Sequence, residues 1–259
     1  MVTVLYGGRL GNNMLQYATG YIFAKKFNYV LETPASYGND YHWPAPNSHY
    51  FNDYGKFFSI DTSFGKFSYK EPDYNWVNID ESNLIQYLSM DSILPAHYVI
   101  NDWFQYPELV LKYRNELKSV YKPVYKERDP NELFVSVRLG DILGRSSVLP
   151  LEYYIDAIER VSFTKGYISS DSIEHPMIEI LSKKYNLTIW DNKDPLVKLD
   201  FAKDFNQLVL SEGTYCWWMG ALSNAKTVIC NNRHANKKNI WHGDIFVYPD
   251  WIKLNYDFN

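Results

Sequence analysis

Apolar and polar residues alternate along the second half of the chain with the periods of strands and helices. Short apolar runs rich in β-branched residues predict buried strands, and stretches with apolar residues three or four positions apart predict helices. The pattern predicts strand 133–137, helix 151–161, strand 166–169, helix 176–185, strand 187–190, a helix around 201–210, a helix from Thr214 to Leu222, and strand 227–230. This alternation predicts a doubly wound parallel sheet.

The first half is less regular. Val2 to Tyr6 predicts a strand, 7–12 a glycine loop, and the spacing of Met14, Leu15, Ala18 and Ile22 a following helix. Residues 34–80 lack periodicity and predict an irregular insertion, helical periodicity returns over 107–121, and the charged segment 121–130 predicts a linker. We therefore expect two domains, 1–125 and 126–259.

One arginine ends a predicted strand of the second half. In the run from Phe134 to Asp141, Arg138 follows an apolar strand, and open α/β sheets bind ligands where their strands end. Arginine keeps its charge and donates a planar fork of hydrogen bonds to phosphate or carboxylate oxygens. From this run alone, a surface salt bridge is an equally good interpretation.

Two more loops should meet Arg138 at the same edge of the sheet, 169–173 and 211–215. The helix start at Thr214 supplies a hydroxyl and backbone N–H donors for an anion, although a simple N-cap explains Thr214 equally well. Asp171 and Ser172 are candidates for holding a ribose or a base edge. The three loops together predict a nucleotide pocket.

The overall composition limits the kinds of molecule that the protein is expected to bind. A net charge of −4 among 259 residues argues against a nucleic-acid surface. The 23 tyrosines and 8 tryptophans suit carbohydrate binding, but an ordinary core explains them as well. Cys216 and Cys230 lack the spacing of a metal cluster or redox pair, and no segment is long and apolar enough to span a membrane. An Asp-x-Asp motif, which holds diphosphate through a metal ion, is absent from the sequence.

Several segments, in order, resemble the inverting α-1,2-fucosyltransferases. The stretch from Gly7 to Ala18 is similar to the amino-terminal Gly-Gly-Leu-Gly-Asn-Gln-Met-Phe-Gln-Tyr-Ala of that family, with Arg9 inserted. The other matches are Trp103-Phe104-Gln105 on Tyr-Phe-Gln, 136–141 on His-x-Arg-Arg-Gly-Asp, 169–174 on Phe-Ser-Asp-Asp, 211–218 on Ser-Asn-Ser-Ser/Thr-Phe-Ser-Trp-Trp, and 248–253 on Pro-x-x-Trp.

The resemblance implies a GT-B fold, in which two Rossmann-like domains face a cleft. It implies an acceptor-side amino-terminal domain, a carboxyl-terminal domain that binds a GDP-sugar, and metal-independent transfer with inversion and no other cofactor. Arg138 falls on the arginine that grips the β-phosphate of GDP. The remaining donor-binding positions that it implies are Gly8, Asn12, Asp171, Ser172, Ser211, Gly213, Thr214 and Tyr215.

The chain departs from the family at the donor motif. Ser136 replaces the histidine, Leu139 replaces the second arginine, and Glu212-Gly213 replaces Asn-Ser. We expect transfer of L-fucose from GDP-L-fucose to a glycan hydroxyl, α-1,2 on a galactoside. GDP-rhamnose, GDP-mannose or another GDP-deoxysugar as donor, and an inert glycan-binding or nucleotide-binding protein, stay open. NAD-dependent oxidation is disfavoured because the glycine spacing does not fit.

No catalytic base follows from the sequence. Asp141 is the carboxylate nearest to Arg138 in the chain and is the first candidate, although an aspartate beside an arginine more often orients it. Asp102 and Glu32 are weaker candidates. Because animal relatives carry a membrane anchor and this sequence shows none, we expect a cytoplasmic protein from a bacterial or viral source, with a GDP-sugar and a glycan as its partners.

Overall fold

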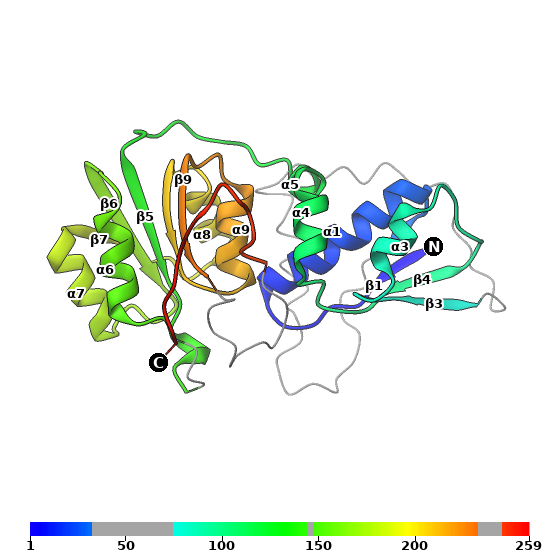
Figure 1. Ribbon diagram of the computed structural model, residues 1–259, viewed down its shortest axis with the longest axis horizontal. Helices are drawn as coiled ribbons and strands as arrows, with labels where there is room; N and C mark the ends of the chain where they lie inside the picture. Colours follow the sequence, from blue (N-terminus) through cyan, green and yellow to red (C-terminus); the bar gives the residue numbers. More distant parts are fainter. Residues whose placement is uncertain (33–74, 145–147, 233–244, 259) are drawn as a thin grey trace. The chain divides into compact units, whose positions relative to one another are not determined.

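The computed structural model describes residues 1–32, 75–144, 148–232 and 245–258. The chain divides into two compact units, Met1–Val124 and Tyr125–Asn259. Each unit contains one parallel sheet with helices packed against it (Figure 1). The expected α/β class, with two Rossmann-like units, is therefore confirmed.

The first unit has a four-stranded sheet in the order β2-β1-β4-β3, with all neighbours parallel. Its strands are β1 (Val2–Val4), β2 (Leu31–Glu32), β3 (Trp76–Ile79) and β4 (His97–Ile100), and its helices are α1 (Leu10–Phe27), α3 (Leu84–Ser89), α4 (Pro107–Lys112) and α5 (Arg114–Tyr121). Val2 and Val4 of the central strand β1 are completely buried. Because β1 lies between β2 and β4, the loops after β1 and β4 are neighbours at the carboxyl edge of this sheet.

Three predictions for the first unit need correction. Helix α1 already begins at Leu10, within the predicted glycine loop. The predicted helix 107–121 is two helices separated at Tyr113. Most of the predicted irregular insertion lies outside the described residues, but its last part forms β3, because pairing with β4 satisfies the backbone of Trp76–Ile79 despite their weak sequence pattern.

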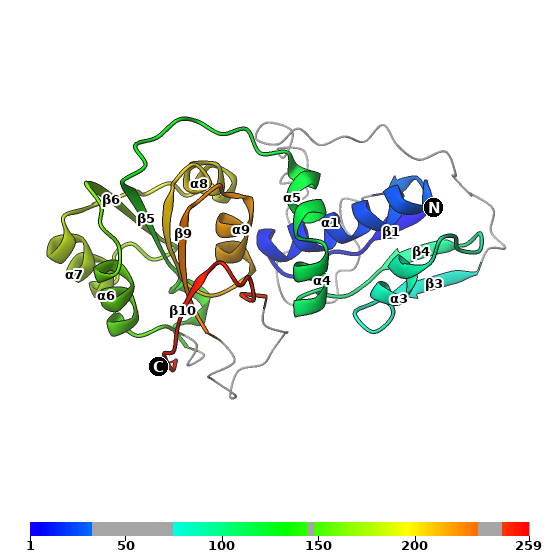
Figure 2. The same cartoon turned by 45° about the horizontal axis from the view of Figure 1, so that its top comes forward.

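The second unit has a six-stranded parallel sheet in the order β10-β9-β8-β5-β6-β7 (Figure 2). Its strands are β5 (Glu132–Val137), β6 (Lys165–Ser170), β7 (Leu187–Ile189), β8 (Gln207–Leu210), β9 (Thr227–Asn231) and β10 (Ile252–Leu254). Its helices are α6 (Leu151–Glu159), α7 (Pro176–Tyr185), α8 (Pro195–Ala202) and α9 (Thr214–Leu222), with a 3₁₀ turn at Gly140–Ile142. Helices α6 and α7 cover one face, and α8 and α9 cover the other (Figures 1 and 2).

The predicted helix around 201–210 is wrong. The helix α8 lies earlier, because Pro195 opens it and the Asp194 carboxylate accepts hydrogen bonds from the backbone N–H groups of Leu196 and Val197, at 2.8 and 3.4 Å. Residues Gln207–Leu210 instead form the buried strand β8 between β5 and β9. A short apolar run fits a buried helix or a buried strand, and here the two neighbouring strands decide.

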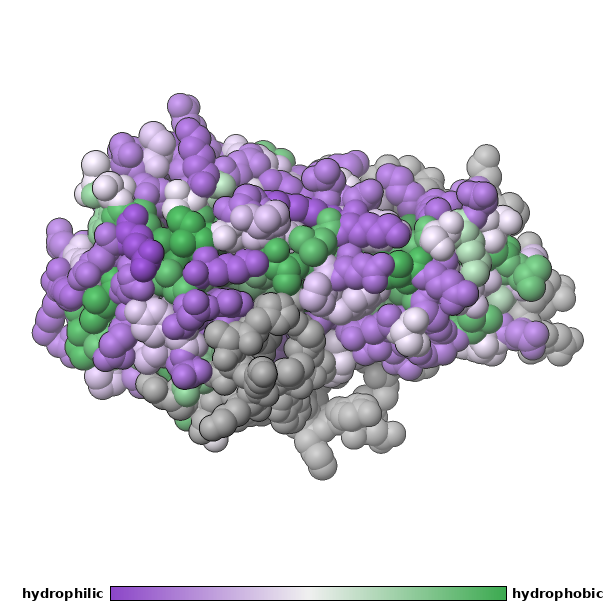
Figure 3. All heavy atoms as spheres, in the orientation of Figure 1, coloured by the Kyte–Doolittle hydropathy of each residue, from purple (hydrophilic) through white to green (hydrophobic). Residues whose placement is uncertain are grey.

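On the face that Figure 3 shows, hydrophilic side chains cover most of the area of the described residues. Hydrophobic side chains form separate small patches there. Among the residues that the structure describes, no helix is both long and apolar enough to cross a membrane.

Candidate functional site

The topology of the second sheet places two loops at its switch point. From β5 the chain proceeds through α6 to β6, and from β8 it proceeds in the opposite direction through α9 to β9. Helices α6 and α9 lie on opposite faces, so the loops after the neighbouring strands β5 and β8 separate from each other. Ligands of open α/β sheets bind at this point, beyond the carboxyl ends of the strands. Arg138 follows β5, and 211–213 follow β8.

The Arg138 side chain packs directly against Gly213. A Cβ atom placed on Gly213 would overlap the Nη1 atom of Arg138, so no larger residue fits without moving the guanidinium. Gly213 has a φ of 99° and is the residue immediately before α9. The first backbone N–H groups of a helix lack partners within it and carry the positive end of its dipole. The Arg138 guanidinium and the start of the nine-residue helix α9 thus lie side by side.

Two aspartates hold the loop that carries Arg138. Asp141 Oδ1 lies 3.5 Å from Nη2 of Arg138, and their side chains are 16% and 31% exposed. Asp171 Oδ1 accepts hydrogen bonds from the backbone N–H groups of Leu139 and Gly140, at 2.8 and 3.0 Å. The predicted meeting of the loops after β5 and β6 therefore occurs through Asp171, and a role of Asp171 toward a nucleoside stays a prediction. Ser172 donates its backbone N–H to Ser170 Oγ at 3.0 Å.

Hydrogen bonds to other strands and helices hold the residues before and within α9 in place. Tyr154 Oη, from α6, donates to Ser211 Oγ at 3.0 Å, and the Ser211 N–H donates to the Ser136 carbonyl at 2.9 Å. Tyr215 Oη donates to the Pro195 carbonyl at the start of α8, at 2.6 Å. Thr214 is the first residue of the helix, so its predicted N-cap role is wrong and Gly213 holds that position.

Two of the three departures from the fucosyltransferase motif, Ser136 and Leu139, face the interior of the unit. Leu139 is completely buried in the hydrophobic core. Ser136 Oγ lies 3.4 Å from Cys216 Sγ, and burial raises the pKa of the Cys216 thiol to about 11 although the charge of Arg138 opposes the shift. Neither Ser136 nor Leu139 supplies a charged donor to the edge of the sheet.

Sequence reasoning missed one cation at this edge. Lys198, in the first half of α8, donates from Nζ to the carbonyl of Ser170, the last residue of β6, at 2.9 Å. Burial lowers the pKa of Lys198, and the carboxylate of Asp171 partly opposes this. The pair Asp194-Pro195, an N-cap followed by a first-turn proline, was the signal that would have located α8 and this lysine.

In the first unit, Gly8 and Asn12 lie together at the carboxyl edge of the sheet. Gly8 has a φ of 72°, and a Cβ there would overlap the Asn12 amide and the Trp103 ring. Asn12 Oδ1 accepts from Gln105 Nε2 at 3.0 Å. The loops after β1 and β4 are thereby joined, and donor binding by Gly8 and Asn12 stays a prediction.

The two weaker candidates for the catalytic base, Asp102 and Glu32, lie at different places in the first unit. Both carboxylate oxygens of Asp102 accept hydrogen bonds from backbone N–H groups, Oδ1 from Trp103 at 2.8 Å and Oδ2 from Glu81 at 3.1 Å. Glu81, which the sequence did not single out, has its pKa raised by burial and by the charge of Asp102. Glu32 is the last residue of β2. Its charge acts on His97, the first residue of β4, and on the amino group of Met1, which precedes β1.

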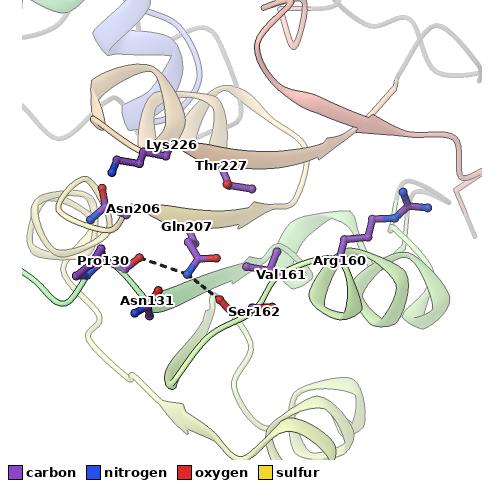
Figure 4. Close-up of a pocket in the computed structure, with 9 residues that line it drawn as sticks. All are labelled: Pro130, Asn131, Arg160, Val161, Ser162, Asn206, Gln207, Lys226 and Thr227. Carbon is purple, nitrogen blue, oxygen red and sulfur yellow. Dashed lines mark hydrogen bonds between the residues drawn. The ribbon is translucent and has the colours of Figure 1, made fainter.

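A hollow of about 340 Å³ lies at the opposite edge of the second sheet (Figure 4). Its lining residues precede or begin strands of the sheet, and Gln207 Nε2 donates to the carbonyls of Pro130 and Ser162 at 3.3 and 3.1 Å. None of the predicted site residues lines it. Ligands of parallel α/β sheets bind at the carboxyl ends of the strands, so we assign the candidate site to the edge with Arg138.

Comparison with known proteins identifies no family for this chain. No model of a protein family matches the sequence, and no curated protein matches it. The chain is similar to the structure of a mutant of FUT1 from Arabidopsis thaliana in complex with GDP, with 12% sequence identity, a TM-score of 0.46, and coverage of 87% of this chain and 69% of that chain. The assignment of the site therefore rests on the geometry of the chain itself.

Proposed function

We propose that this protein is a glycosyltransferase that binds a GDP-sugar at the carboxyl edge of the second sheet. The proposed donor is GDP-L-fucose, and the proposed acceptor is a glycan hydroxyl, on a galactoside in α-1,2 linkage. Transfer inverts the anomeric carbon and uses no metal ion. The donor and acceptor classes rest on the sequence resemblance, and the location of the donor rests on the structure.

One observation carries the proposal, namely the packing of Arg138 against Gly213 at the switch point of the sheet. It places a permanent positive charge beside the start of α9, where backbone N–H groups point outward. A diphosphate is the ligand that best matches this combination, because its oxygens accept from both a guanidinium fork and backbone N–H groups.

The same geometry favours the departure of a nucleoside diphosphate. The acceptor oxygen forms a bond to the anomeric carbon while the bond from that carbon to the β-phosphate oxygen breaks, and its electron pair goes to the phosphate. Arg138 and the α9 N–H groups stabilise the developing charge, each such fixed donor being worth roughly 3 to 4 kcal/mol. The acceptor proton passes to a base. We assign Asp141 the role of orienting Arg138, since the two side chains are paired.

The test is nucleotide binding by calorimetry, with GDP, UDP, ADP and NAD in the presence of EDTA. We expect selective binding of GDP and a 10- to 100-fold weaker binding by Arg138→Ala, because a charge-assisted hydrogen bond is lost. Arg160→Ala is the matched control, since Arg160 pairs with Asp156 on the exposed surface of α6. Equal GDP affinity of wild type and Arg138→Ala would refute the site.

A second candidate function is nucleotide or glycan binding without transfer. The observation that favours it is the burial of Leu139, which leaves the edge without the second arginine of the resembling family. Prolonged incubation with GDP-fucose, GDP-rhamnose or GDP-mannose and a panel of galactosides separates the two functions. A glycoside product that depends on the donor excludes the inert protein, and GDP binding without any product excludes the transferase.

A further inference from the structure

Lys198 lies at the same carboxyl edge of the second sheet as Arg138. It is beside the end of β6, whereas Arg138 follows the end of β5. Its ammonium group reaches the carbonyl of Ser170, where β6 ends, although the lysine itself belongs to α8. Helix α8 is fastened to α9 by the hydrogen bond from Tyr215 to the carbonyl of Pro195. Lys198 is therefore held close to the first turn of α9, against which Arg138 packs through Gly213.

Within the described part of the chain, no carboxylate forms an ion pair with Lys198, and its observed acceptor is the neutral Ser170 carbonyl. An ammonium group has three N–H donors, so two are available to a ligand. Two exposed lysines of this unit, by contrast, form ion pairs with carboxylates, Lys126 with Asp200 and Lys183 with Glu179. The charges of Asp171 and Asp191 act on Lys198 from beyond ion-pair distance and offset only part of the cost of its burial, so an anionic ligand would offset more of that cost.

The electrostatic environment supports the same location. Arg138 and Lys198 both lower the pKa of Cys216, in the first turn of α9, so both charges lie near that turn. Beneath this edge, Ser169 Oγ is buried without a hydrogen-bond partner among the described residues, although Ser136, its neighbour in register, bonds to Cys216. Two cations thus lie near the start of one helix, together with the carboxylate of Asp171, whose charge acts on the same thiol.

We infer that Lys198 is a second phosphate-binding cation of the donor site, and that together with Arg138 it selects a diphosphate over a monophosphate. The inference rests on the proposed function, because it concerns the same site. A diphosphate carries two anionic groups that two separated cations can bind at once, whereas a monophosphate has only one. Loss of Lys198 should therefore weaken the diphosphate more than the monophosphate.

The test measures binding of GDP, GMP and inorganic pyrophosphate to wild type, Lys198→Met and Lys198→Gln. We expect both variants to bind GDP and pyrophosphate about 10- to 100-fold more weakly, and GMP less than threefold more weakly. Lys198→Gln keeps a donor for the Ser170 carbonyl but removes the charge. Lys183→Met is the control, since Lys183 is 76% exposed and pairs with Glu179 on α7.

The outcomes separate the inference from the proposed function. Wild-type protein that binds neither GDP nor pyrophosphate would refute both. Tight GDP binding by wild type that both Lys198 variants retain would refute only the role of Lys198. A structural role predicts a lower Tm for Lys198→Met and an equal loss for GDP and GMP, and that result would also overturn the inference.

Discussion

Replacement of Gly213 by alanine tests the central feature of the site, the close packing of Arg138 against the start of α9. Gly213 has φ 99° and ψ 153°, a backbone conformation that is almost confined to glycine. A side chain there costs roughly 1 to 3 kcal/mol of folding free energy. In addition, the new Cβ would displace the Arg138 guanidinium, with which it would overlap.

Two effects should follow in Gly213→Ala. The Tm should fall by roughly 3 to 10 °C, as a loss of that size implies for a chain of this length. GDP binding should weaken about as much as in Arg138→Ala, because in both variants the guanidinium no longer lies beside the N–H groups of α9. Differential scanning calorimetry measures the first effect, and titration calorimetry the second.

A neighbouring glycine provides the control. Gly144 is exposed, and a Cβ added there meets no atom within 4 Å, so Gly144→Ala should leave both Tm and GDP affinity unchanged. The double variant Gly213→Ala/Arg138→Ala should bind GDP no worse than either single variant, since the two changes remove the same interaction. If Gly213→Ala keeps wild-type GDP affinity, the packing described here is not required and the reasoning fails.

Two further predictions concern the core beneath the site. Leu139→Arg, which restores the arginine of the resembling family, should lower the unfolding free energy by more than about 3 kcal/mol in urea titrations, because position 139 is completely buried; unchanged stability would contradict that burial. Burial raises the pKa of Cys216 from 9 to about 11, so the unfolded chain releases this proton first as the pH rises. Stability should therefore decline between pH 9 and 11, by roughly 2 to 3 kcal/mol from this thiol. Cys216→Ala should show a shallower decline, and identical pH profiles would count against a buried neutral thiol.

The hydrophobic pattern of the sequence was sufficient for most elements of the second unit. The predicted helix 176–185 and the helix from Thr214 to Leu222 have the observed bounds, and the predicted strands at 133–137 and 166–169 lie within one residue of β5 and β6. These elements are recognisable because local signals, such as a first-turn proline or a β-branched run, agree with their tertiary environment. Arg138 could be located for the same reason, since it directly follows a clear strand.

Other features depend on contacts that no local pattern encodes. Residues Gln207–Leu210 form a strand because β5 and β9 pair with them on both sides, and Trp76–Ile79 form one because β4 does. Lys198 reaches the edge of the sheet only because α8 crosses beside the end of β6. Its role was hidden from the sequence, in which 28 residues separate it from Ser170.

The sequence by itself determined that this is an α/β chain with an arginine at the end of a central strand, because strand and helix periods and strand ends are local properties. Only the tertiary structure decided which groups surround that arginine. Long-range packing placed Gly213 against its guanidinium, tied Asp171 to its loop, turned Leu139 into the core and brought Lys198 to the edge. Each of these features joins residues from different strands or helices, or results from the burial of one side chain. They therefore depend on the order of the strands in the sheet, and not on the neighbours of each residue in the chain.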